Sequence, residues 1–191
     1  MATNLEIEVK TLLSYPQYQQ TLRHFDLDVS DGFIQKNYYI DTNDLALRNL
    51  GLSLRIRKLN GYLMTLKLPM AEGLLEKTQI LTKEQFLALR KENVFPTGSI
   101  YDFLDSLYVK IEKLEILASL STLRIEVNYG EHKLAIDENR YSDKQDFELE
   151  MEATSLRQAR ETLAKICEEI GFPFVENFES KQKRAFKALK S

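Results

Sequence analysis

Charged residues recur at every second position in the strand-like segments of this sequence, and this pattern constrains the fold more than any other feature. Successive side chains of a strand point to opposite faces, so a period of two predicts β-strands. In residues 5–10, for example, Leu5, Ile7 and Val9 alternate with glutamate and lysine. The same period predicts eight strands, at residues 4–10, 33–40, 52–59, 62–68, 74–80, 121–129, 132–137 and 146–152.

Turn and capping signals separate these strands. The pair Asn60-Gly61 and the residue Gly130 each predict a hairpin. Capping boxes predict helices from residue 82 to about 93 and over 155–171, and a further helix is expected over about 179–189. Weaker helical patterns cover 15–25, 43–50 and 99–113. We expect Asp41 or Thr42 to cap the helix at 43–50 and Gly51 to end it.

Many antiparallel strands with a few helices predict an α+β fold. There is no internal repeat and no obvious linker, so we expect one functional domain over residues 1–191. The stretch 93–110 is where the chain could most readily be divided into two halves.

Three of the charged strand faces carry two like charges at positions i and i+2. The pairs are Glu6 and Glu8, Arg55 and Arg57, and Glu148 and Glu150. An antiparallel sheet with one face in water also shows this alternation. Like charges on one face repel, however, and such faces are better explained if the strands converge on ligands of opposite charge.

The side chains on these faces suit a phosphate compound together with a metal ion. The cationic donors are Lys10, Arg55, Arg57, Lys67 and Arg124, with Lys181 from the last helix. Arginine and lysine bind phosphate oxygens. The hard oxygen donors are Glu6, Glu8, Asp137, Glu148 and Glu150. Carboxylates suit Mg²⁺ or Mn²⁺, which commonly accompany phosphates.

Composition excludes several other classes of protein. The net charge of −3 is not that of a typical nucleic-acid binder. No run of apolar residues is long enough for a membrane helix, and the N-terminus does not resemble a signal peptide. The single cysteine, Cys167, allows no internal disulfide and is expected to pack in a helix. His24 and His132 are too few for a zinc site. We therefore expect a cytoplasmic protein without a nucleic-acid or membrane partner; the oligomeric state is not indicated.

The charged motifs resemble those of a known family. Residues 6–10, Glu-Ile-Glu-Val-Lys, match the Glu-x-Glu-x-Lys signature of the CYTH family, the triphosphate tunnel metalloenzymes. Similar elements follow in the family's order: Tyr39-Ile40-Asp41-Thr42, Leu54-Arg55-Ile56-Arg57, Lys67, Glu76, Arg124, Asp137, Phe147-Glu148-Leu149-Glu150 and Ser180-Lys181. The resemblance spans residues 4 to 186. The neighbours of Glu76, Leu75 and Lys77, depart from the family's pattern and leave its role uncertain.

The resemblance implies an eight-stranded antiparallel β-barrel that forms a charged tunnel, with helices packed on the outside. It implies that Mg²⁺ or Mn²⁺ is held by Glu6, Glu8, Asp137, Glu148 and Glu150. It implies that a triphosphate is bound by Lys10, Arg55, Arg57, Lys67, Arg124 and Lys181. The residues expected to take part in catalysis are Lys67, Arg57 and Glu148. Glu76 could position a basic side chain rather than bind metal.

The implied activity is metal-dependent hydrolysis of inorganic triphosphate or a small organic triphosphate, which makes the protein a phosphoric anhydride hydrolase. Two alternatives stay open: a class IV-type adenylate cyclase, and a non-catalytic module that binds polyphosphate or a nucleotide. Thiamine triphosphate is a further possible substrate. The chain has no tryptophan to stack on thiamine, although Tyr38, Tyr39 or Phe33 could take that place.

Overall fold

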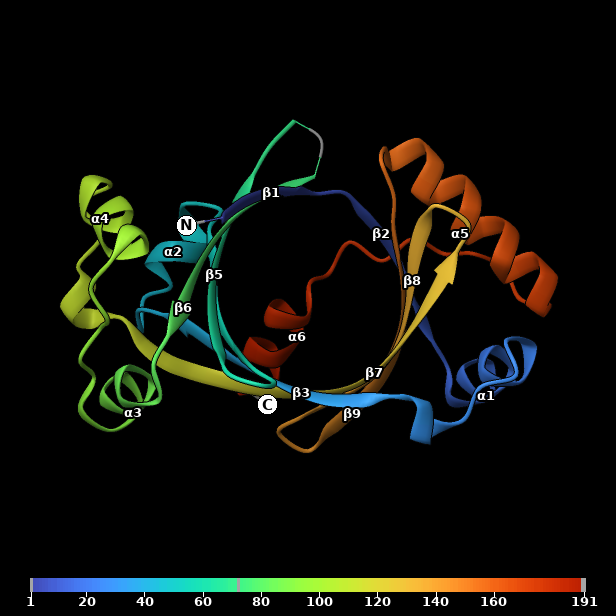
Figure 1. The fold of residues 1–191 in the computed structure, drawn as a ribbon, viewed down its shortest axis with the longest axis horizontal. Coiled ribbons are helices and arrows are strands. Elements are labelled where there is room, and N and C mark those ends of the chain that lie inside the picture. The colour runs from blue at the N-terminus through green and yellow to red at the C-terminus, as the bar shows by residue number, and fades with distance from the viewer. Residues whose placement is uncertain (1, 72, 190–191) are drawn as a thin grey trace.

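One antiparallel sheet rolls into a nearly closed barrel in the computed structural model, which describes residues 2–71 and 73–189 (Figure 1). The strands are β1 (Ala2–Glu6), β2 (Glu8–Leu13), β3 (Phe33–Asp41), β4 (Ser53–Lys58), β5 (Tyr62–Pro69), β6 (Leu74–Leu81), β7 (Glu115–Tyr129), β8 (His132–Tyr141) and β9 (Lys144–Glu152). Their order in the sheet is β1-β6-β5-β4-β3-β7-β8-β9-β2. The predicted α+β barrel is therefore confirmed.

The N-terminal segment connects the two ends of this sheet. β1 pairs with β6, whereas β2, which follows after Ile7, pairs with β9. The sequence predicted a single strand over residues 4–10. The break at Ile7 divides that strand in two and gives nine strands instead of eight. Because β1 and β2 are consecutive, Glu6 and Glu8 lie where the chain crosses from one side of the barrel to the other.

The remaining strands agree with the alternating pattern but are longer at several ends. β7 begins at Glu115, six residues before the predicted start, and β8 continues to Tyr141. Both predicted hairpins form, with Lys58 paired to Tyr62 and Tyr129 paired to His132. Gly130 has a φ of +62°, which glycine adopts more readily than other residues.

Helices occupy most of the predicted positions. They are α1 (Tyr15–His24), α2 (Ala46–Asn49), α3 (Lys83–Glu92), α4 (Ser99–Ser106), α5 (Leu156–Ile170) and α6 (Lys181–Ala188). The helix predicted over 99–113 is wrong as one element, because α4 ends before Tyr108, whose φ is +56°. A short 3-10 helix follows at Ile111–Lys113. None of the helices formed by the described residues is long and apolar enough to cross a membrane.

Asp41 and Thr42 both cap the start of α2. The carboxylate of Asp41, which is fully buried, accepts hydrogen bonds from the backbone N–H groups of Leu47 at 2.8 Å and Arg48 at 3.1 Å. The hydroxyl of Thr42 accepts from the N–H of Ala46 at 2.9 Å. Capping oxygens satisfy backbone donors that have no partner within a helix. In this chain the Asp-Thr motif therefore has a structural role beside the barrel.

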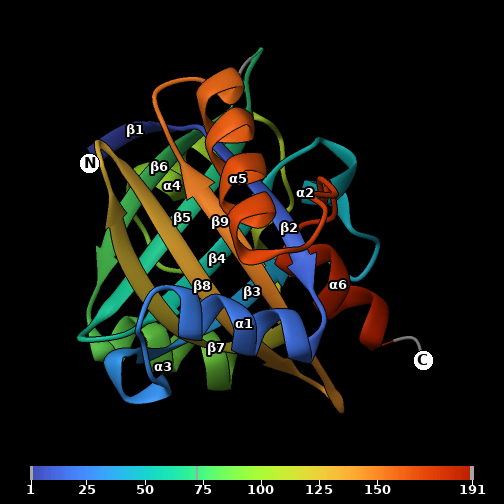
Figure 2. The same ribbon diagram turned by 90° about the vertical axis from the view of Figure 1, so that its right-hand side faces the viewer.

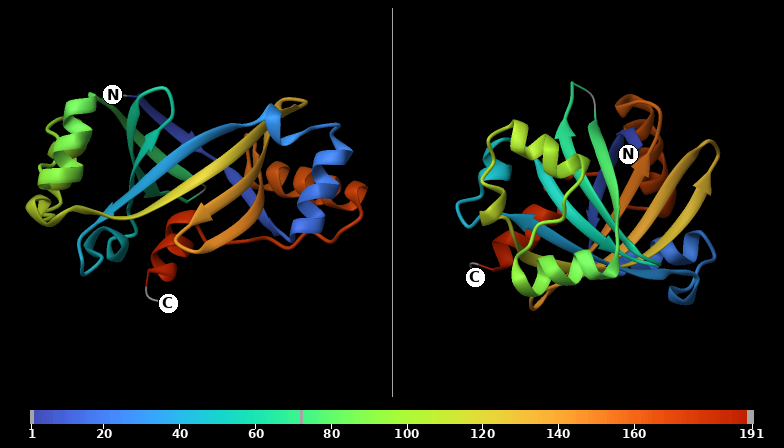
Figure 3. Two further views of the ribbon diagram at one scale, coloured as in Figure 1. Left: turned by 90° about the horizontal axis from the view of Figure 1, so that it is seen from below. Right: turned by 60° about the vertical axis from the view of Figure 1, so that its left-hand side comes forward.

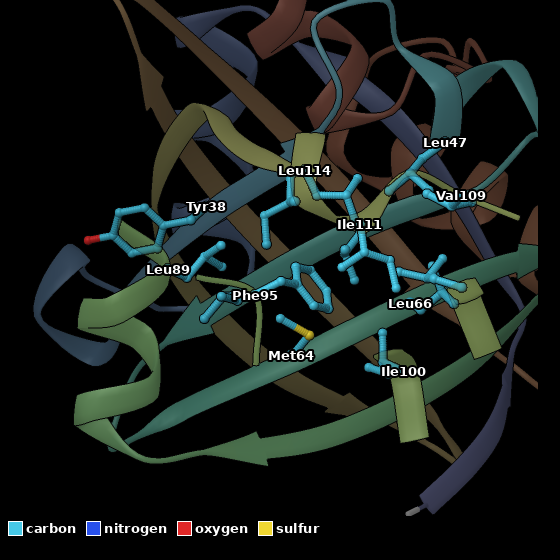
Figure 4. Close-up of a cluster of buried hydrophobic side chains, with 14 of the residues drawn as sticks. Tyr38, Leu47, Met64, Leu66, Leu89, Phe95, Ile100, Val109, Ile111 and Leu114 are labelled. Atoms are coloured by element: carbon cyan, nitrogen blue, oxygen red, sulfur yellow. The ribbon is translucent and has the colours of Figure 1, made fainter. Parts of the chain in front are cut away.

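Two apolar clusters cover the outer face of the barrel. One lies between β3–β6 and the helices α2, α3 and α4, and includes Ile56, Met64 and Leu66 (Figure 4). The other lies between β2, β8, β9 and the helices α1 and α5, and includes Cys167 (Figure 2). The two helical groups flank the barrel on opposite sides (Figure 3). Since the apolar strand faces pack outward, the charged faces are left to line the interior.

α6 differs from the other helices because it packs across one end of the barrel (Figures 1 and 2). Ala185 and Phe186 of α6 form a buried cluster with Tyr39, Ala118 and Leu120 of β3 and β7. The prediction that the helices pack on the outside is thus incomplete. The inward face of β7 turns apolar at Ala118 and Leu120, and α6 covers it there.

Candidate functional site

A polar cavity of about 120 Å³ lies inside the barrel. Every strand except β8, together with the start of α6, contributes to its lining: Glu6, Glu8, Lys10, Gln35, Asn37, Tyr39, Ser53, Arg55, Arg57, Lys67, Leu74, Arg124, Glu150, Ser180, Lys181 and Gln182. The alternation of each strand brings these residues together, because every second side chain points inward.

Most of the residues predicted for the site line this cavity. The structure brings together Glu6, Glu8, Lys10, Arg55, Arg57, Lys67, Arg124, Glu150 and Lys181. Three predicted residues, Glu76, Asp137 and Glu148, lie behind the lining. Asp137 and Glu148 are fully buried at 0% exposure. Each of the three contacts a cationic side chain that reaches the cavity.

Lys67 on β5 lies between two carboxylates. Its Nζ atom bonds to Glu6 on β1, and it lies 2.9 Å from Oε1 of Glu76 on β6. Arg55 on β4 lies 3.7 Å from the same oxygen. Burial raises the pKa of Glu76, but Lys67 and Arg55 together lower it below its ordinary value. Glu76 therefore contacts two of the cationic side chains that line the cavity.

A second charged cluster joins β7, β8, β9 and α6. Arg124 donates to both oxygens of Asp137, at 2.8 and 2.6 Å, and also to Glu150. Nζ of Lys181 lies 2.7 Å from Asp137 and 2.6 Å from Glu150. Desolvation lowers the pKa of Lys181, but the surrounding carboxylates raise it above its ordinary value. Lys181 therefore stays protonated at neutral pH.

Arg184 on α6 belongs to this cluster and was missed at the sequence level. Its guanidinium bonds to Asp146, with Nε 2.8 Å from Oδ2, and to Oε2 of Glu148. Burial raises the pKa of Glu148 to about 7, although Lys181 opposes this effect. The sequence held only a weak signal for Arg184, namely that it lies one helical turn after Lys181 and so on the same face of α6.

Arg57 faces the cavity without an ion-pair partner among the described residues. It forms no ion pair with any carboxylate in the described part of the chain, and its buried Nε has no hydrogen-bond partner there. Nε of Arg55 is likewise unpartnered. Burial and the neighbouring charges of Arg55 and Arg124 lower the pKa of Arg57 to about 10. Two neighbouring guanidinium groups in a cavity, of which Arg57 has no ion pair among the described residues and Arg55 has only Glu76 at 3.7 Å, form a site for an anion.

Uncharged polar residues form another part of the wall, and of these only Ser180, as part of the Ser180-Lys181 element, was named from the sequence. They are Gln35 and Asn37 on β3, Ser53 on β4, and Ser180 and Gln182 at the start of α6. The hydroxyl of Ser53 donates to Gln182. These residues lack the charge that marked the others. Strand alternation could have identified Gln35, Asn37 and Ser53, whereas Ser180 and Gln182 lie at the start of a helix.

The three aromatic residues that were considered for stacking on thiamine lie in different parts of the structure. Tyr38 lies in the outer apolar cluster, 5.0 Å between ring centres from Phe86. Tyr39 lines the cavity but is only 3% exposed, and it packs edge-on to Phe186. Phe33 opens β3 and is partly buried. The proposed stacking role of Tyr38 is therefore wrong, because its side chain points away from the cavity.

The carboxylates fit a divalent cation in their chemistry. Glu6, Glu8 and Glu150 line the cavity. Burial and the like charge of Glu150 raise the pKa of Glu8, but Lys10 and Lys67 together lower it below its ordinary value. Within the described residues, no three acidic, histidine or cysteine side chains already converge as a metal cage. Mg²⁺ usually takes one or two carboxylates together with substrate phosphates and water, so it does not require such a cage.

Comparisons with known proteins agree with this architecture. The Bacillus subtilis (strain 168) protein named "Putative triphosphatase YjbK" is 33% identical over 174 residues, which cover 91% of this chain and 90% of the relative. A crystal structure described as a "putative adenylate cyclase" from Bacillus halodurans is 33% identical, covers 97% of this chain and 100% of its own, and has a TM-score of 0.90.

A more distant structure shares the fold. It is the "Putative adenylyl cyclase HpAC1" from Hippeastrum, which is described as having a dominant triphosphatase activity. Its TM-score is 0.78 at 21% identity, and the match covers 96% of each chain. The family model of the CYTH domain matches residues 4–177. With the charged barrel and this match over most of its length, the chain belongs to the CYTH domain family.

Proposed function

We propose that this protein is a metal-dependent hydrolase that cleaves inorganic triphosphate inside its barrel. The observation that carries the proposal is the small cavity in which Arg55 and Arg57 have unpartnered Nε atoms. The 33% identity to a Bacillus subtilis protein named as a triphosphatase supports it. The predicted cytoplasmic location is part of the same proposal.

The size of the cavity favours the inorganic substrate. Its volume is about 120 Å³, whereas pockets for drug-sized ligands usually measure roughly 300–1,000 Å³. A linear triphosphate is mostly charged oxygen, which matches a wall of cations. A nucleoside or thiamine group would have to remain outside this space, and α6 covers one end of the barrel.

The charged residues divide the work of the reaction. Arg55, Arg57 and Lys67 would hold phosphate oxygens at one part of the triphosphate. Lys10, Arg124 and Lys181 would hold the oxygens along the rest of the triphosphate. Glu6, Glu8 and Glu150 would hold Mg²⁺ or Mn²⁺ from the cavity side, with Glu148 and Asp137 behind them. The cation would neutralise charge on the phosphates. Water attacks the terminal phosphorus, and the bond to the bridging oxygen breaks to release pyrophosphate and orthophosphate.

Positioning and charge stabilisation supply most of the rate acceleration in phosphoryl transfer. Arg57 suits this role because it brings a positive charge that no described carboxylate neutralises. Lys67 suits this role because its ammonium group is held at the cavity wall between Glu6 and Glu76. We propose these two side chains, with Glu148, as the catalytic group.

Adenylate cyclase activity is the second candidate, because the Bacillus halodurans relative carries that name. A cyclase must bring the ribose 3′-hydroxyl to the α-phosphorus, so part of the nucleoside must enter the site. The cavity volume opposes this reaction in the present chain. A binding module without turnover is the third candidate.

One assay separates the three candidates. Purified protein is offered inorganic triphosphate, ATP and thiamine triphosphate in Mg²⁺ and in Mn²⁺, and released phosphate and cyclic AMP are both measured. We expect rapid phosphate release from inorganic triphosphate and little from the others. Cyclic AMP from ATP would replace the proposal with the cyclase, and binding without any product would replace it with the binding module.

A further inference from the structure

α6 belongs to the site although it lies beyond the matched part of the chain. The CYTH family model ends at residue 177, whereas α6 spans Lys181–Ala188. Lys181 and Gln182 line the cavity, and Arg184 reaches the buried carboxylates behind it. The role of Arg184 therefore differs from those of the residues that would bind the substrate or the metal.

The guanidinium of Arg184 is fixed on every side. Nε and Nη2 donate to the two oxygens of Asp146 at 2.8 and 3.3 Å, and Nη2 also donates to Oε2 of Glu148. Nη1 donates to the backbone oxygen of Glu179 at 2.8 Å. The residue is 7% exposed and does not line the cavity. Arg184 therefore has no freedom to follow a ligand.

The other oxygen of Glu148 has a different partner. Oε1 accepts from Nζ of Lys181 at 3.2 Å, and the same Nζ also contacts Asp137 and Glu150. Lys181 lines the cavity and can turn toward a phosphate. When it does so, Arg184 is the cation that still holds Glu148.

We propose that Arg184 is a positioning residue, which anchors Oε2 of Glu148 and so keeps Oε1 on the side of Lys181 and the cavity, where it would be available to a metal ion. The inference rests on the proposed function. It follows from burial: a carboxylate with 0% exposure requires a paired cation. Without Arg184, Oε2 of Glu148 would lose its anchor and the carboxylate would turn, so that Oε1 would no longer be held on the cavity side. Partners behind metal ligands commonly act in this way.

A purely structural role for Arg184 makes different predictions. α6 is also held by Ala185 and Phe186 in an apolar cluster and by Gln182 through Ser53. If Arg184 only anchored the helix, its loss would lower thermal stability without a selective effect on metal binding or on kcat.

The test compares Arg184→Gln and Arg184→Lys with the exposed control Arg140→Gln. Arg140 also pairs with a glutamate, Glu138, at 2.6 Å, but its side chain is 70% exposed. Mn²⁺ binding is measured without substrate from the electron paramagnetic resonance signal of free Mn²⁺. Steady-state kinetics with inorganic triphosphate and thermal unfolding complete the set.

We expect Arg184→Gln to weaken Mn²⁺ binding and to lower kcat, each by about 10- to 100-fold, with KM changed by less than about threefold because Arg55, Arg57 and Lys67 are untouched. Arg184→Lys should recover part of both losses, and the control should behave as the wild type. If Arg184→Gln does not fold, Arg184→Lys carries the test with the same direction of change.

Two results would overturn the inference. One is wild-type Mn²⁺ affinity and kcat in a folded Arg184 variant, and the other is a wild-type protein that binds no Mn²⁺. Failure of the proposed function is distinguishable, since the wild type would then bind Mn²⁺ but release no phosphate from triphosphate. In that case the difference in Mn²⁺ affinity between wild type and Arg184→Gln still decides the role of Arg184.

Discussion

Individual side chains show how the barrel tolerates so many charges in its interior. Glu6 pairs with Lys67 and Glu8 pairs with Lys10, at 2.6 Å in the second case. Each of these two like-charged glutamates therefore has a cationic partner. Arg57 is the exception on the described wall, since no carboxylate neutralises it. Such a group is unfavourable for folding and is retained where function needs it.

Arg57→Ala should therefore separate activity from stability. We expect kcat/KM for triphosphate to fall by about 10²- to 10³-fold, as for other donors that stabilise a developing charge. The melting temperature should be unchanged or higher, because the pKa of Arg57 is lowered to about 10 and the folded protein therefore opposes its charge at neutral pH. Activity assays and calorimetry measure the two effects.

Arg140→Ala is the matched control for Arg57→Ala, since Arg140 is exposed and lies outside the cavity. It should retain full activity. An Arg57→Ala protein with wild-type kcat/KM, or one that melts several degrees lower, would contradict the assignment.

Cys167 is predicted to be unreactive in the folded protein. Its side chain is fully buried in the cluster beneath α5, and burial raises the pKa of the thiol to about 11. Since the thiolate is the reactive form, a disulfide reagent at pH 8 should modify almost none of it within minutes. After unfolding in denaturant, one equivalent should react. Reaction of a full equivalent in native buffer would show that the site is open.

At the scale of elements, the crossing between β1 and β2 determines the position of Glu6 and Glu8. Gly73, just before β6, lies against this crossing with a φ of +75°. A Cβ atom at Gly73 would lie 2.3 Å from the backbone oxygen of Glu6. No side chain fits there without moving the segment between β1 and β2, on either side of which Glu6 and Glu8 lie.

Gly73→Ala should destabilise the protein by at least about 1–3 kcal/mol, which is the range for a residue held in an unfavourable backbone conformation. It should also lower activity through displacement of Glu6. Gly61→Ala is the control, because a Cβ at Gly61 meets nothing within 4 Å. Denaturant unfolding gives the difference, and equal stability of the two variants would refute the close approach.

At the scale of the whole molecule, the net charge of −3 conceals a cavity whose lining has more cationic side chains than carboxylates. The outer clusters hold the barrel shape, whereas the interior depends on ion pairs and leaves Arg57 unpaired. A polyanion in the cavity should therefore stabilise the entire fold. Ligands that bind only the folded state raise stability by mass action.

We expect inorganic triphosphate to raise the melting temperature of the metal-free protein. At a concentration about 100 times the Kd the stabilisation should approach 2.7 kcal/mol, and it should weaken as sodium chloride screens the charges. Sodium chloride of matched ionic strength, without triphosphate, is the control. An equal shift in the control would show that the effect is one of ionic strength alone.

The sequence by itself determined the barrel and most of its wall. The period of two placed Glu6, Arg55, Lys67 and Arg124 on the charged faces of their strands, because alternation in a strand is a local property of the backbone. The family resemblance implied that these faces line the interior. It also placed Cys167 in a helical core. The break at Ile7 was not predictable, since it depends on which strands pair with each half of the N-terminal segment.

Only the tertiary structure decided which charges meet. Asp137 and Glu148 share the alternation of the cavity residues but lie behind them, because Arg124, Lys181 and Arg184 pack over them. Arg184 is part of the site only because α6 packs against β7. These are contacts between distant segments, and a local pattern carries no information about the distance between such segments.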